Sequence, residues 1–111
     1  MPPVEQAKFE ERFRHIRGTG RLNSRVPIAI EWTEAGQTRR VEGYTRDISS
    51  KGCMAVVPQE LAVGQKLRLI NNVNQNSSEA ALIWRGHQGP SGWELGLELF
   101  EPPPDYWGLD F

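Results

Sequence analysis

A period of two in the hydrophobic pattern, repeated in short segments from Val26 to Phe100, is the feature that most constrains the fold of this chain. In the first segment Val26, Ile28, Ile30 and Trp32 alternate with smaller or polar residues. This is the pattern of a strand with one buried face. Similar segments follow at close spacing, and clusters of turn-forming residues separate them. The pattern predicts an all-β chain whose strands are joined by hairpins.

We expect six strands along this pattern, and they cover residues 26–32, 38–46, 53–57, 66–71, 79–85 and 92–100. Short strands at this spacing predict an antiparallel sheet that closes, or nearly closes, into a barrel. Pro102, Pro103 and Pro104 cannot continue a strand ladder, so the sheet should end before them. The aromatic residues of the last few positions, Tyr106, Trp107 and Phe111, together with Leu109, are expected to fold back over a barrel end or to meet a partner.

The amino-terminal part of the chain has a different periodicity. Phe9, Phe13 and Ile16 fall on one face of a helix that we expect over residues 4–17. A Gly-Thr-Gly sequence at residues 18–20 then breaks the helix. No helical pattern of comparable length follows the barrel, so a long carboxyl-terminal helix is not expected.

These changes of pattern divide the chain into three parts. We expect a helical arm at residues 1–17, a flexible linker at residues 18–25, and a β-barrel with a short tail at residues 26–111. The segment before the first strand, residues 1–25, carries six basic and three acidic side chains. A basic segment joined to a near-neutral body indicates a local site for an anion, or else a solvated arm.

Charge and hydropathy exclude several classes of protein. The chain has 111 residues and a formal net charge of −1. Domains that track a nucleic-acid backbone need many cations, so we expect no direct nucleic-acid binding. The sequence has no apolar run near about 18 residues and no charged-then-apolar leader, which predicts a cytoplasmic protein without membrane insertion.

Few side chains are suited to catalysis or metal binding. Cys53 is the one cysteine, which excludes an internal disulfide and a multi-cysteine zinc site. It begins an apolar strand, so we expect a core thiol. His15 and His87 have no carboxylate cluster or metal-ligand spacing around them. We therefore expect no catalytic residue, no metal, no cofactor and no enzyme activity.

Two arginines spaced four apart, Arg21 and Arg25, precede the first strand. A planar guanidinium can bind phosphate in a bidentate manner, donate to a guanine edge and stack on a base. In a mobile segment such a pair could close around a ligand. The spacing alone is weak evidence, because it occurs by chance in many sequences.

A second polar cluster lies in the loop expected at residues 47–52. The carboxylate of Asp47 can accept the paired N–H donors of a guanine Watson–Crick edge, and Ser49 could act from the same side. Gly52 lacks a Cβ, which allows close approach of a ligand or of backbone. The alternative is a turn in which Asp47 and Ser49 only satisfy backbone N–H groups.

Taken together, the pair Arg21 and Arg25 and the set Asp47, Ser49 and Gly52 resemble the signature of the PilZ family. That family consists of bacterial receptor domains for cyclic di-GMP, built on a six-stranded antiparallel β-barrel. The resemblance extends over about residues 20–100. It implies a PilZ-type barrel here, and the periodicity of residues 4–17 adds a short amino-terminal helix in front of it.

The resemblance also implies a role for each signature residue. Arg21 and Arg25 would bind the phosphates and guanine faces of cyclic di-GMP, while Asp47 and Ser49 would hold a guanine on the barrel surface. Gly52 would let that base lie close.

Two further positions differ between members of the family. In some members a Trp on the penultimate strand packs beside a guanine, and Trp84 is similar in place, although a core position is the alternative. Lys51 stands where many members have Gly, so it would add a cation near the ligand or point into solvent.

The function implied is that of a single-domain cyclic di-GMP receptor. Binding would order the linker that holds the arginines and pass the signal to a protein partner. The alternative is a PilZ-like adaptor that binds no nucleotide and acts only through protein contacts.

Overall fold

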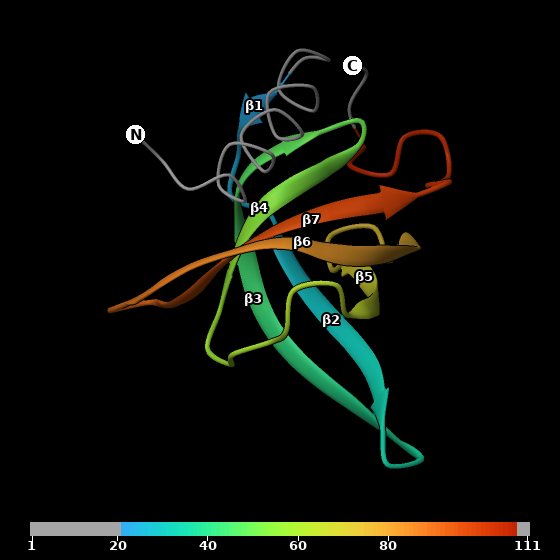
Figure 1. Cartoon of the computed structure of the whole chain (residues 1–111). Coiled ribbons are helices and arrows are strands. Elements are labelled where there is room, and N and C mark those ends of the chain that lie inside the picture. Colours follow the sequence, from blue (N-terminus) through green and yellow to red (C-terminus); the bar gives the residue numbers. More distant parts are fainter. Residues whose placement is uncertain (1–20, 109–111) are drawn as a thin grey trace.

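The computed structural model describes residues 21–108 of the chain (Figure 1). The described strands are β1 (Leu22–Asn23), β2 (Pro27–Glu34), β3 (Gln37–Ser49), β4 (Gly52–Val57), β5 (Lys66–Asn71), β6 (Ser77–Gly89) and β7 (Gly92–Phe100). Within this part of the chain there is no helix. The helix expected at residues 4–17 lies outside the described residues, as do Leu109 and Phe111.

The long strands close into an antiparallel barrel (Figure 1). Their order is β3-β2-β5-β6-β7-β4, and β4 pairs back with β3 to complete the circle. This confirms the predicted all-β, six-stranded antiparallel barrel. The short strand β1 adds to the end of β3 through the pairs Leu22↔Ile48 and Asn23↔Asp47.

Two expected loops are parts of strands. The loop predicted at residues 47–52 is a two-residue turn, because Asp47 and Ser49 pair with Met54 and Gly52 as the end of β3 and the start of β4. The turn predicted around residues 86–90 is shorter for the same reason, since β6 continues to Gly89 beside β7. In both places cross-strand hydrogen bonding prevails over the turn preference of Gly, Ser and Asp.

Inward-facing side chains of every long strand fill the barrel, as the alternating pattern predicts. The fully buried large members are Ile28, Ile30, Ile48, Val57, Leu69, Leu82, Leu95 and Leu97. Trp32 belongs to the same cluster, and Trp93 packs against it from a partly buried position. Trp84 is not a member of the core cluster.

The tail folds back onto the barrel, as expected from its aromatic residues. Tyr106 and Trp107 are buried in the core cluster, and their rings pack edge to face with centroids 4.8 Å apart. The Tyr106 hydroxyl donates to the carbonyl of Leu69 (2.6 Å), and the indole N–H of Trp107 donates to the carbonyl of Ser49 (2.8 Å). These bonds tie residues 106 and 107 to β5 and to the end of β3.

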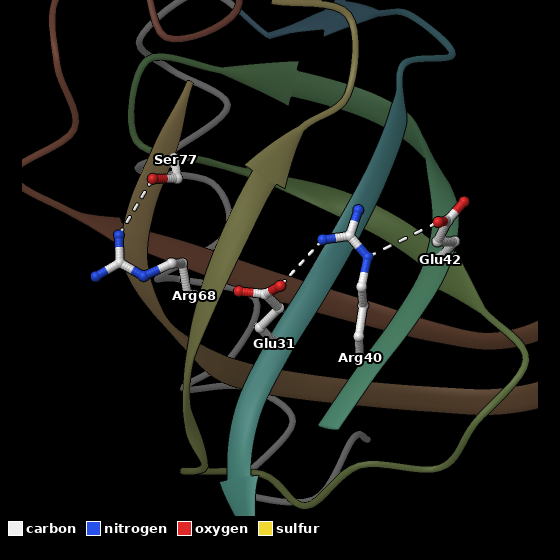
Figure 2. Close-up of polar contacts among 5 residues, drawn as sticks. All are labelled: Glu31, Arg40, Glu42, Arg68 and Ser77. Carbon is white, nitrogen blue, oxygen red and sulfur yellow. Dashed lines mark hydrogen bonds and ion pairs between the residues drawn. The ribbon is translucent and has the colours of Figure 1, made fainter. Parts of the chain in front are cut away.

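The outer face of β2, β3, β5 and β6 is a wall of charged and polar side chains (Figure 2). Arg40 lies 3.0 Å from Glu31 and 3.8 Å from Glu42, and Arg68 donates to Ser77 (3.1 Å). These pairs are exposed and of mixed sign, so they add little stability and create no strong local potential. The wall therefore offers control positions for tests of charge elsewhere on the barrel.

Candidate functional site

Pairing of β1 with β3 brings the two halves of the arginine and aspartate motif together. Asn23 lies opposite Asp47 in the ladder, which places Arg21 beside the same carboxylate. The Arg21 Nη1 and Asp47 Oδ2 atoms are 3.4 Å apart, and the side chains are 24% and 13% exposed. Residues far apart in sequence thus form one partly buried charged pair at the edge of the barrel.

Arg25 is held differently from Arg21. Its guanidinium lies over the ring of Tyr44 on β3, with Cζ 3.9 Å from the ring centroid. Tyr44 pairs with Val56 in the ladder, and only the Thr45–Ala55 pair and the bulge separate it from the pair formed by Asp47 and Met54. Both arginines of the motif therefore contact side chains of the same stretch of β3.

Ser49 is buried, with 1% of its surface exposed. Its hydroxyl accepts a bond from the backbone N–H of Lys51 (3.2 Å) and contacts the carbonyl of Gly52 (3.5 Å). Its own carbonyl accepts the indole N–H of Trp107. In this structure the hydroxyl serves the turn, which is the alternative that the sequence left open, and contact with a ligand stays a prediction.

Gly52 has a structural reason of its own for lacking a side chain. A Cβ built on this residue would overlap the carbonyl oxygen of Leu97 on the neighbouring strand β7. The close approach that Gly52 allows here is therefore between two strands of the barrel. Approach of a base at the same residue stays a prediction.

Trp84 belongs to one row of paired residues with Asp47. The row runs through cross-strand neighbours from β3 to β6, in the order Asp47, Met54, Gly96 and Trp84. Directly paired residues of an antiparallel sheet share a face, and the flanking Ile48, Cys53 and Leu97 point into the core. The row therefore lies on the outer face, and Gly96 places no side chain between Met54 and Trp84.

Sequence reasoning missed three neighbours of this row. Met54 and Tyr44 fall within the predicted strands 53–57 and 38–46, but alternation does not reveal which strand lies opposite. Arg46 is the residue skipped by the β3 bulge, and its guanidinium lies 3.3 Å from Glu94 on β7. A bulge next to a motif indicates that a side chain points in a changed direction. The bulge itself can be recognised only once the strand register is known.

A shallow recess of about 530 Å³ lies on another part of the barrel. Glu31, Lys66, Arg68, Glu79 and Phe100 contribute to its lining, together with other residues of β2, β5 and β6. The four charged side chains balance in sign, and none of the motif residues takes part. A doubly charged anion gains nothing from such a balanced set, so we place the candidate site at β1, β3 and β4 instead.

Within residues 21–108, no group of three His, Cys, Asp or Glu side chains is arranged to hold a metal ion. No helix of that region is long and apolar enough to cross a membrane. Burial raises the pKa of the Cys53 thiol far above its usual value, and the negative charge of Asp47 adds to the rise. Cys53 is thus the core thiol that the sequence predicts, and it is a poor nucleophile.

Alkaline pH is expected to destabilise the protein through two buried groups. Burial raises the pKa of Tyr106 as well, with a smaller contribution from Cys53. The free thiol ionises at about pH 8.5 and the free phenol at about pH 10. Above these pH values, unfolding therefore releases protons that the native state retains. This stability is fully present below about pH 8.5 and is lost as the pH rises above it.

The measurement is the urea midpoint of unfolding between neutral pH and about pH 11. We expect the midpoint to fall above about pH 9, and we expect the fall to be smaller in a Cys53→Ala, Tyr106→Phe double variant. An equal fall in the double variant would show that other groups cause it.

The described part of the chain is thus a closed antiparallel barrel with Arg21 and Asp47 paired where β1 meets β3. The family model of the PilZ domain matches residues 12–106 of the chain. The chain therefore belongs to the PilZ family, whose members are ligand-binding receptor domains associated with cyclic di-GMP. Comparison with curated proteins and with solved structures gave no match.

Proposed function

We propose that this protein is a cyclic di-GMP receptor that binds the dinucleotide at the outer edge formed by β1, β3 and β4. One observation supports the proposal above all others. Arg21 and Asp47 come from separate halves of the family signature, yet they lie 3.4 Å apart. A cation and an acceptor for guanine N–H groups are thereby presented side by side.

Each group at this edge has a chemical counterpart in cyclic di-GMP. The guanidinium groups of Arg21 and Arg25 suit its two phosphates and the faces of its bases. The Asp47 carboxylate suits the N–H donors of a guanine edge. The Trp84 ring, in the same row as Asp47, suits stacking of a base, which stabilises nucleotide complexes generally.

We expect binding to rearrange the Arg21–Asp47 pair, because a guanine edge held by both carboxylate oxygens of Asp47 uses the oxygen that Arg21 contacts. We propose that this exchange, together with ordering of the part of the linker that precedes β1, carries the signal to a protein partner. Amide exchange over residues 14–26, with and without ligand, measures that ordering directly. Unchanged protection there would remove the ordering step from the proposal.

The receptor function is tested by calorimetric titration of the whole chain with cyclic di-GMP, with GTP as the ligand control. We expect binding at about 1 μM or tighter for cyclic di-GMP. Arg21→Ala and Asp47→Ala should each weaken binding by roughly 10- to 100-fold, because hydrogen bonds between charged groups are lost. Arg68→Ala and Glu42→Ala change similar charges on the wall of Figure 2 and should leave binding within about twofold.

Absence of heat on a folded sample free of bound nucleotide would contradict the receptor function. It would leave the alternative, an adaptor of the same family that acts only through protein contacts. Equal losses in Arg21→Ala and in Arg68→Ala would instead show that general charge, and not this edge, governs binding.

A further inference from the structure

Two adjacent residues of β3, Tyr44 and Thr45, hold Arg25 from its backbone and from its side chain. The Thr45 side chain is fully buried. Its hydroxyl donates to the carbonyl of Ser24 (2.6 Å) and accepts the N–H of Val26 (2.8 Å). The backbone N–H of Thr45 also donates to the carbonyl of Val26 (2.9 Å). The chain is therefore fixed immediately before and after Arg25.

The side chain of Arg25 is held by an aromatic ring instead of a carboxylate. Among residues 21–108, no acidic side chain forms an ion pair with Arg25, whereas Arg21 is paired with Asp47. A carboxylate would occupy guanidinium N–H donors and cancel the charge. The guanidinium carbon of Arg25 instead lies over the face of the Tyr44 ring, a contact that does not neutralise the charge.

The position of Tyr44 relates this contact to the site. Tyr44 faces outward beside Val56, and Asp47 faces outward beside Met54, at successive outward positions on either side of the bulge. An arginine lying on Tyr44 is thus on the same outer face as the acceptor carboxylate. Its positive charge therefore lies on the face where a dianionic ligand is expected.

We propose that Tyr44 and Thr45 are positioning residues for the nucleotide, which act by presenting Arg25 in its binding conformation. Thr45 sets the path of the backbone, and Tyr44 supports the guanidinium on one face. A guanine that stacks on the opposite face completes a three-layer stack of base, guanidinium and phenol ring. The inference rests on the proposed receptor function and adds residues outside the family signature to it.

A double-mutant cycle separates this role from a general effect on folding. Tyr44→Leu should weaken cyclic di-GMP binding by roughly 5- to 20-fold, because the support of the cation is lost. Tyr44→Phe keeps the ring and should restore binding to within about twofold. In an Arg25→Ala background, Tyr44→Leu should have no further effect beyond about twofold, since the residue acts only through Arg25.

Thr45 is tested by a pair of variants of similar size. Thr45→Val removes both side-chain hydrogen bonds and should weaken binding about as much as Tyr44→Leu. Thr45→Ser keeps the hydroxyl and should bind within about twofold of wild type. Circular dichroism and thermal unfolding verify that each variant is folded. If Thr45→Val is unfolded, Thr45→Ser still tests whether the hydroxyl is sufficient for binding.

The outcomes distinguish this inference from the receptor function. If wild type binds and responds to Asp47→Ala, but Tyr44→Leu has no effect or adds fully to Arg25→Ala, the positioning role is wrong and the receptor function stands. If wild type does not bind cyclic di-GMP at all, both are wrong. Loss of binding in Tyr44→Phe as well would assign the role to the hydroxyl and also overturn the stack.

Discussion

Replacing Trp107 by Ala should lower the free energy of unfolding by about 3–5 kcal/mol, the usual loss for truncation of a buried aromatic side chain. The indole belongs to the core cluster and packs edge to face on Tyr106. Its N–H is also the donor to the carbonyl of Ser49 at the end of β3. The variant therefore creates a cavity and leaves a carbonyl without this partner, and the two losses add.

The loss is measured by urea unfolding followed by far-ultraviolet circular dichroism, which does not depend on the removed indole. Trp107→Phe keeps most of the ring and removes the hydrogen bond, so it should lose less, about 1–2 kcal/mol. Phe100→Ala is the matched control, because that ring is 39% exposed. A Trp107→Ala variant as stable as Phe100→Ala would show that the tail does not form part of the core.

Gly52→Ala is expected to destabilise the barrel by about 2–4 kcal/mol, a large value for the addition of one methyl group. The added Cβ would overlap the carbonyl oxygen of Leu97, and backbone atoms cannot move aside as a flexible side chain can. Gly52 does not have a positive φ, so the effect is steric and not conformational. The strands β4 and β7 would have to separate where Gly52 pairs with Glu98.

The control for this variant is Gly89→Ala, at the end of β6. There the nearest atom to an added Cβ is 3.9 Å away, so an ordinary contact results and stability should change by less than about 1 kcal/mol. Thermal unfolding of the two variants side by side measures the difference. Equal stability of Gly52→Ala and wild type would contradict the packing of β4 against β7 described here.

The comparison of Gly52 with Ser49 shows how far the signature alone can be interpreted. The sequence left two roles open for Ser49, ligand contact or turn formation, and its hydroxyl bonds within the turn in the structure. At Gly52 the sequence indicated close approach, and the structure adds that the approaching group is the backbone of Leu97. Both residues can be essential to a binding site without touching the ligand.

The position of Arg21 illustrates the opposite case. The residues before the first strand have no clear periodicity, so no strand was predicted there. Backbone pairing of Leu22 and Asn23 with β3 brings Arg21 to Asp47. A strand of two residues is too short to show a hydrophobic pattern. It forms because it pairs with the end of β3.

By itself the sequence determined the fold class, the approximate positions of the six long strands and the family to which the chain belongs. It could do so because alternation, turn residues and motif spacing are local properties of the chain. The tertiary structure alone decided the register, the bulge before Asp47, the row that joins Asp47 to Trp84, and the support of Arg25 by Tyr44. Each of these depends on which strand lies opposite another, and that is decided when the barrel closes and buries its inward faces together.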